Sequence, residues 1–201
     1  MDIDKVLQRV KAILLTPKTE WPIIAAEPAT TGSVITYAAI LALIPLVASV
    51  LGAVLFVGRL GLGINLVLAS AVISYLIGLG ILFVMGIIAA ALAPSFDGQN
   101  SQIQGLKLIV YASTPVYVAG VLQIIPGLNV IASLVGLAYG IYLIYLGARP
   151  VVGVPEVKSG GYTAVIVIIW LILQLVVSAI IVTAIMGAFF SGALIAGAAA
   201  G

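Results

Sequence analysis

Hydrophobic positions fall into five long runs along the chain, separated by short polar segments. A helix needs roughly 20 apolar residues to cross the hydrocarbon core of a bilayer, and each run is long enough. No run carries Asp, Glu, Lys or Arg at its mid-depth. The pattern therefore predicts an all-α integral membrane protein, a five-helix transmembrane bundle, with spans at about 34–57, 64–92, 106–125, 128–147 and 163–187.

The first 32 residues have a different pattern, and we interpret them as a cytoplasmic or interfacial amphipathic segment. Apolar residues recur at helical spacing over residues 3–14, and polar residues such as Lys5 and Arg9 fall largely on the other side. This predicts a helix of about four turns on the membrane surface, ended by Pro17, with Trp21 at the level of the headgroups. Packing of this helix against the protein's own loops is the alternative, and both can hold together.

Residues 33–190 form the predicted five-span domain, and residues 188–201 form an apolar tail rich in alanine and glycine. The tail is too short for another crossing. It either extends the fifth span or lies in the membrane interface, and the pattern leaves both arrangements open. Only Pro126 and Gly127 separate the third and fourth spans, which predicts a tight helical hairpin.

Composition excludes a soluble protein and most catalytic chemistry. Hydrophobic residues make up 64% of the chain, charged residues make up 7%, and the mean hydropathy is +1.36. A soluble domain needs about 25% charged residues to cover its surface. The absence of cysteine and histidine removes thiolate and imidazole metal ligands and the commonest general base. We therefore expect no catalytic residue, metal or cofactor, and the net charge of +2 indicates no nucleic-acid partner.

Lysine and arginine residues predict the orientation. With five spans, seven of them fall on one side of the membrane and only Arg59 falls on the other. Positive charge marks the cytoplasmic side. We therefore expect the N-terminus in the cytoplasm and the C-terminus outside, with the chain in the inner (cytoplasmic) membrane of the cell.

Rows of small residues predict where the spans pack. Lipid tails are as apolar as leucine, so helix association requires close approach of the backbones. Three spans carry such rows at intervals of four: Ser70, Ser74 and Gly78; Ala132, Gly136 and Gly140; Ala179, Thr183 and Gly187. We interpret these rows as intramolecular contacts, with a seam between two copies of the chain as the alternative.

The segment 145–165 places three charged residues between two apolar spans. Gly147 and Pro150 are expected to end the fourth span, and residues 159–161, Ser-Gly-Gly, to bend the chain back. The segment is either a structured interfacial loop or a functional contact surface. The candidate residues of that surface are Arg149, Pro150, Pro155, Glu156, Lys158, Gly161 and Tyr162.

Tyrosine side chains of the third and fourth spans suggest a second candidate site. They fit an aromatic belt at the membrane interface, with some hydroxyl groups satisfied inside the bundle. The alternative is a polar cavity among spans two to four that opens toward the cytoplasm. Its candidate residues are Tyr111, Pro115, Tyr117, Asn129, Tyr139 and Tyr142.

Several motifs occur in a fixed order: "SFDGQNS" (95–101), "YASTP" (111–115), "IIPGL" (124–128), "YGIYLIYLG" (139–147) and "VPEVKSGGYTAV" (154–165). Together they resemble the bacterial branch of the Yip1 family, in which the first motif more often reads Phe-Gly-Gly, so that Asp97 stands for a glycine. The resemblance implies five spans, a cytoplasmic N-terminus and an external C-terminus. Eukaryotic relatives serve vesicle traffic and associate with Rab GTPases.

The expected function is a non-enzymatic membrane scaffold that acts through its cytoplasmic loops, because nearly all charge gathers on one side of the membrane. Expected partners are membrane lipids, and either a second copy of the chain or another membrane or cytoplasmic protein. A transporter, channel or lipid-moving protein is the alternative, motivated by Pro45 and Pro115 within spans and by the tyrosines. The lack of an ionisable residue at mid-depth counts against a coupled pump.

Overall fold

The computed structural model describes residues 3–57, 64–125 and 127–199, and for residues 57, 64–66, 182 and 184–199 it describes the backbone. Contacts divide the chain into two compact units, residues 1–166 and residues 167–201. The tertiary contacts discussed below all lie within the first unit. In the described ranges every regular element is helical and no strand occurs.

Five helical stretches are long and apolar enough to cross a membrane. They are Thr31–Phe56, Val67–Phe96, Gln102–Ile124, Leu128–Val152 and Glu156–Ile181. The predicted all-α fold with five candidate spans is confirmed, with boundaries that differ from the predicted ones by up to seven residues, most of all in the fifth span.

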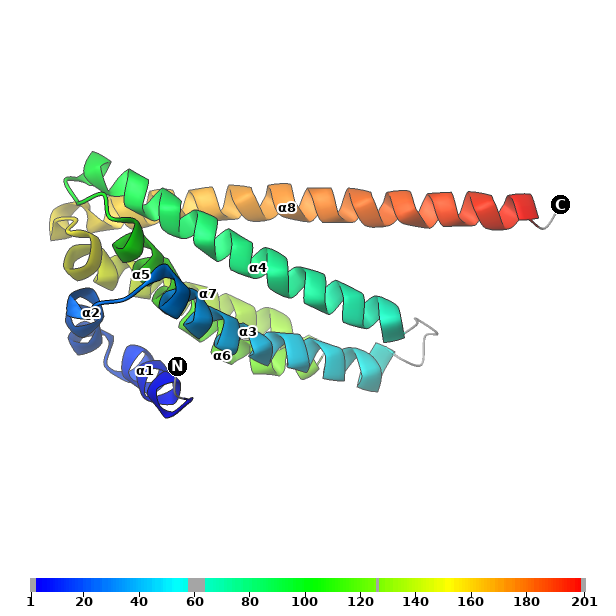
Figure 1. The fold of residues 1–201 in the computed structure, drawn as a ribbon, viewed down its shortest axis with the longest axis horizontal. Coiled ribbons are helices and arrows are strands. Elements are labelled where there is room, and N and C mark those ends of the chain that lie inside the picture. Colours follow the sequence, from blue (N-terminus) through cyan, green and yellow to red (C-terminus); the bar gives the residue numbers. More distant parts are fainter. Residues whose placement is uncertain (1–2, 58–63, 126, 200–201) are drawn as a thin grey trace. The chain divides into compact units, whose positions relative to one another are not determined.

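The N-terminal segment consists of two helices, α1 (Ile3–Leu15) and α2 (Pro17–Ala26) (Figure 1). Pro17 ends α1 as predicted and also begins α2. Proline is tolerated there because the N–H groups in the first turn of a helix have no intrahelical acceptor, so the N–H that proline lacks is not missed. α1 packs on the protein through Val6 and Ile13 and leaves Leu7 exposed. Trp21, for which the headgroup level remains a prediction, is fully buried in the protein.

The first two spans are α3 (Thr31–Gly52), continued by a π-helical turn η1 (Ala53–Val57), and α4 (Ile64–Leu92), followed by a 3-10 turn η3 (Ala93–Phe96). Thr30 and Ser33 begin α3 with a reciprocal capping box, in which each side chain bonds the other's backbone N–H at 3.1 Å. The helix continues through Pro45.

The third span is broken into α5 (Gln102–Ala112), α6 (Thr114–Ala119) and a 3-10 turn η4 (Gly120–Ile124). The break falls next to Pro115, where a kink is predicted, because proline removes a backbone donor and clashes with the preceding turn. α5 begins four residues before the predicted start of the span. Lys107 therefore lies inside this helix, where it is buried.

The fourth span, α7 (Leu128–Val152), packs on the third through its glycines. A Cβ atom on Gly136 would lie 3.0 Å from the Cα of Val116, and one on Gly140 would lie 3.0 Å from the carbonyl oxygen of Ala112. The interpretation of this row as an intramolecular contact is confirmed. Small residues allow here the backbone approach that burial cannot drive in lipid.

The predicted end of the fourth span at Gly147 and Pro150 is wrong. α7 continues to Val152, because a proline in the last turn costs only one backbone hydrogen bond. The helix ends at Gly153, whose φ of 71° is in the left-handed region and whose N–H donates to the carbonyl of Arg149 at 3.1 Å.

The predicted bend at residues 159–161 is also wrong. These residues belong to the first turns of α8 (Glu156–Ala199), and only residues 153–155 link α7 to α8. The hydroxyl of Ser159 donates to the carbonyl of Pro155 at 3.1 Å, so it supports the start of the helix. The tail continues α8 as far as Ala199, so it extends the fifth helix.

Candidate functional site

Three connecting regions meet at one end of the first unit (Figure 1): the α1–α2 segment, the loop 97–101 and the linker 153–155. The N–H of Gln99 donates to the carbonyl of Val152 at 2.8 Å, which joins the loop to the end of α7. A Cβ atom on Gly147 would lie 2.9 Å from the indole ring of Trp21, so α2 and α7 are in close contact there. We call this region the charged end, defined by Lys5, Arg9, Lys18, Glu20, Glu27, Asp97, Lys107, Arg149, Glu156 and Lys158.

Arg9 is the centre of a charge cluster in the charged end. Its two terminal guanidinium nitrogens donate to the carboxylates of Glu20, in the first turn of α2, and Glu27, the C-cap of α2. The guanidinium carbon also lies 5.7 Å from the centre of the Tyr111 ring, in cation–π geometry. Because the Arg9 and Glu20 side chains are only 15% and 11% exposed, they tie α1 firmly to α2 and α5.

Lys107 joins the same cluster from α5. Its ammonium group donates to the carbonyl oxygens of Ile24 at 2.8 Å and Glu27 at 2.6 Å, at the C-terminal end of α2. A helix leaves its last carbonyls without partners, and a cation there is favourable. The cluster borders a polar cavity of about 630 Å³. Sequence analysis missed it because its members come from distant parts of the chain.

The predicted contact surface is partly assembled in a second feature, which we call the α2–α8 groove. It is about 470 Å³ in volume and is lined by Lys18, Pro22, Tyr145, Leu146, Arg149, Pro150, Glu156 and Ser159. Arg149 and Glu156 form an exposed ion pair across the linker at 3.3 Å. Lys18 of α2, which sequence analysis did not select, completes the groove.

Lys158 lies outside this groove and pairs with Asp97 of the loop 97–101. Asp97 has a φ of 62°, a left-handed conformation that favours glycine, and the resemblance implies a glycine at this position. The aspartate at this position therefore keeps the left-handed backbone conformation that favours glycine, and it adds a carboxylate. Between the two ion pairs, Val157 projects outward with 98% of its surface exposed.

The remaining residues of the predicted contact surface support the linker. Pro155 is exposed and its carbonyl accepts hydrogen bonds from the first turn of α8. Gly161 faces the ring of Phe96, which an added Cβ atom would approach to 3.2 Å. Tyr162 is fully buried, and its hydroxyl donates to the carbonyl of Ala89 at 2.8 Å.

The six residues of the predicted cavity lie at separate places. Tyr111 borders the polar cavity beside Arg9, Pro115 is buried, and the Asn129 side chain accepts a bond from the N–H of Gly127. The Tyr139 hydroxyl donates to the carbonyl of Leu14 at 2.7 Å, so it fastens α1. The Tyr142 ring lies 5.7 Å from the Tyr139 ring, and the residue is 41% exposed. The sixth residue, Tyr117, reaches a different cavity.

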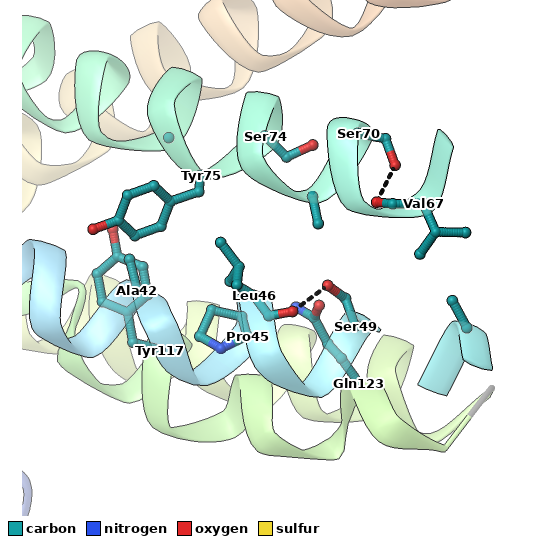
Figure 2. A pocket seen from close by; sticks show the side chains of 13 residues that line it. Ala42, Pro45, Leu46, Ser49, Val67, Ser70, Ser74, Tyr75, Tyr117 and Gln123 are labelled. Atoms are coloured by element: carbon teal, nitrogen blue, oxygen red, sulfur yellow. Dashed lines mark hydrogen bonds between the residues drawn. The ribbon is translucent and has the colours of Figure 1, made fainter. Parts of the chain in front are cut away.

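That cavity lies among α3, α4 and the broken third span (Figure 2) and has a volume of about 450 Å³. Tyr75 and Tyr117 lie at one end of it, while Ser70 and Ser74 of α4 face Ser49 of α3. It is therefore bordered by spans one to three, whereas the sequence suggested spans two to four. The hydroxyls of Ser49 and Ser70 donate to carbonyls of their own helices, at 2.8 and 2.9 Å.

Comparison with known proteins identifies one family. The model of the Yip1 domain matches residues 11–178, which is most of the chain. No curated protein and no solved structure matches the chain. The matched region includes Lys18, both members of the Arg149–Glu156 pair and all of the cavity among α3, α4 and the third span.

Proposed function

The chain belongs to the Yip1 family of membrane proteins, and from this premise we propose that it is a non-enzymatic scaffold of the inner membrane that binds a protein partner through its charged end. The positive-inside rule supports a cytoplasmic position for this end, since it carries six of the eight lysine and arginine residues of the chain. A partner would thus be recruited from the cytoplasm or from the cytoplasmic surface of the membrane.

The observation that carries the proposal is the exposure of Val157 between two ion pairs. Its neighbours Glu156 and Lys158 are engaged by Arg149 and Asp97. These pairs hold the first turn of α8 so that an apolar side chain projects from a charged surface. Protein interfaces have an apolar core surrounded by a polar rim, and an exposed apolar side chain between charged residues fits that arrangement.

Site-specific photo-cross-linking in intact membranes tests the proposal. A photoreactive amino acid at Val157 is expected to give discrete protein adducts, whose masses distinguish a second copy of the chain from another protein. The matched control is the same probe at Val135 of α7, which is exposed within the fourth span and is expected to give lipid adducts only. The double variant Arg149→Glu with Glu156→Arg keeps the ion pair but exchanges the positions of its charges. It is expected to reduce adduct formation about tenfold, which corresponds to a loss of about 1.4 kcal/mol in the free energy of partner binding. Identical adducts from both probe positions would contradict the scaffold.

Transport is the second candidate function, and the cavity among α3, α4 and the third span favours it. The lining of this cavity is more apolar than polar, but it includes three serine side chains and Gln123. Membrane transporters bind their substrates in cavities within their spans. Gly78 borders this cavity and has nothing within 4 Å of an added Cβ atom, so a larger side chain can enter it.

Flux of ions, small polar solutes and labelled lipids into proteoliposomes tests this candidate. If the chain transports, Gly78→Leu is expected to abolish the flux because it fills the cavity. Gly80→Leu is the control, since Gly80 also has free space around it but does not border the cavity. Equal flux in both variants would remove the cavity from the transport path.

A further inference from the structure

The α2–α8 groove combines two cations with one carboxylate on an apolar floor. Lys18 comes from α2, Arg149 from the end of α7 and Glu156 from the first turn of α8. Pro22, Tyr145, Leu146 and Pro150 supply the apolar part of the lining. A volume of about 470 Å³ falls within the range of ligand-binding pockets, about 300–1,000 Å³.

The charges of this groove are only partly satisfied by one another. Arg149 uses one terminal nitrogen for Glu156, which leaves most of its five N–H donors available. Glu156 uses one carboxylate oxygen for Arg149, which leaves the other. Within the described part of the chain, Lys18 forms no ion pair. Together the three side chains carry a net charge of +1, and the groove offers free N–H donors on Lys18 and Arg149 and one free carboxylate oxygen on Glu156.

We propose that the α2–α8 groove binds the headgroup of an amine-bearing zwitterionic phospholipid of the phosphatidylethanolamine type. The phosphate lies between Lys18 and Arg149, and the primary ammonium donates hydrogen bonds to Glu156. Arginine and lysine suit phosphate, and charge-assisted hydrogen bonds are roughly twice as strong as neutral ones. The apolar floor contacts the glycerol and the first acyl carbons.

The carboxylate decides between lipid classes. An anionic headgroup without an amine leaves the second carboxylate oxygen of Glu156 without a donor and is repelled by the carboxylate charge. A choline headgroup has a quaternary nitrogen, which has no N–H to donate. Only a headgroup with both a phosphate and a primary or similar ammonium satisfies all three side chains. This inference deepens the proposed function and rests on it only in placing the charged end at the level of the headgroups.

Lipid binding to the purified full-length chain tests the inference. Native mass spectrometry in one detergent compares phosphatidylethanolamine, phosphatidylcholine and phosphatidylglycerol with identical acyl chains. The expected result for the unmodified chain is an affinity for phosphatidylethanolamine about tenfold above that for the other two. Equal affinity for the ethanolamine and choline lipids would overturn the proposal.

Three single substitutions of exposed residues assign the roles within the groove. Lys18→Gln is expected to weaken binding of all three lipids, since each contains the phosphate. Glu156→Gln is expected to abolish the preference for ethanolamine over choline while the phosphate still binds. Lys158→Gln removes the same charge as Lys18→Gln but lies outside the groove, and is expected to change neither result. Equal effects of Lys18→Gln and Lys158→Gln would show general attraction and overturn the site.

Soluble glycerophosphoethanolamine distinguishes the lipid from a free phosphate compound. It is expected to compete at least about a hundredfold more weakly than the lipid, because it lacks the acyl chains that the membrane presents. Competition at equal concentration would overturn the assignment to a lipid. Cross-linking at Val157 is a separate readout, so failure of this inference and failure of the scaffold are distinguishable.

Discussion

Arg9 links three helices through one side chain. It connects α1 to the carboxylates of Glu20 and Glu27 and to the ring of Tyr111. Tyr111 in turn packs on Tyr37 of α3, with ring centres 4.8 Å apart, and the Tyr37 hydroxyl is 2.9 Å from that of Thr114. One arginine thus begins a continuous set of contacts from the amphipathic helix to the break in the third span.

Substitution of Arg9 is expected to destabilise the protein through the charge that it leaves behind. Arg9→Met strands the largely buried carboxylate of Glu20, and removing one partner of a buried pair costs about 3 kcal/mol. Adding Glu20→Gln is expected to recover much of that loss, because no unpaired charge remains buried. Unfolding of the purified variants in one detergent, followed by circular dichroism against denaturant, measures both free energies. A double variant no more stable than Arg9→Met would contradict this account.

At the scale of helices, α4 and α5 pack most closely where two glycines meet. A Cβ atom on Gly105 would lie 2.4 Å from the carbonyl oxygen of Gly86 and 2.7 Å from the N atom of Ala90. A Cβ atom on Gly86 would lie 2.8 Å from the Cα of Leu106. No side chain larger than hydrogen fits at these positions unless the backbones separate.

Gly105→Ala is therefore expected to lower the free energy of unfolding by about 1–3 kcal/mol, the usual cost of overpacking. The matched control is Gly80→Ala in α4, where nothing lies within 4 Å of the added atom. There the better helix propensity of alanine is expected to leave stability unchanged or to raise it by up to about 1 kcal/mol. The midpoint of denaturation in mixed micelles measures both variants, and similar losses in the two would refute close packing as the cause.

At the scale of the whole molecule, charge and apolar length act together. The five candidate spans are mostly apolar, and the described lysines and arginines lie before the first span or within about two turns of a span end at the charged end. This asymmetry predicts that the charged end and the N-terminus are cytoplasmic and that the C-terminus is outside. Arg59, the residue expected on the opposite side, lies outside the described residues.

The absence of cysteine makes this orientation directly testable, since a single introduced thiol is the only labelling site. Val157→Cys is expected to react with a membrane-impermeant maleimide only after the cells are opened. Gly201→Cys is expected to react in intact cells. Labelling of both positions from the same side would contradict a five-span arrangement, and exchange of the two results would invert the orientation.

The family relation and much of the candidate surface could be predicted from local patterns. The order of the motifs indicated the Yip1 family, which the match over residues 11–178 confirms. Arg149 and Glu156 are seven residues apart, and their pairing crosses a short linker. Helix ends were predicted less well. Proline and glycine often mark the ends of helices, but here Pro150 lies in the last turn of α7 and the Ser-Gly-Gly segment lies in the first turns of α8.

The sequence by itself determined that the chain is an all-helical membrane protein with five candidate spans, because apolar length and the scarcity of charge are properties of composition and order alone. Only the tertiary structure decided which distant residues meet. Lys18 joins Arg149 and Glu156 in the α2–α8 groove, and Arg9 joins Glu20 and Glu27 beside Lys107. These contacts depend on how the helices pack. Small residues in the sequence indicate where two helices can approach closely, but they do not indicate which charged side chains that packing brings into contact.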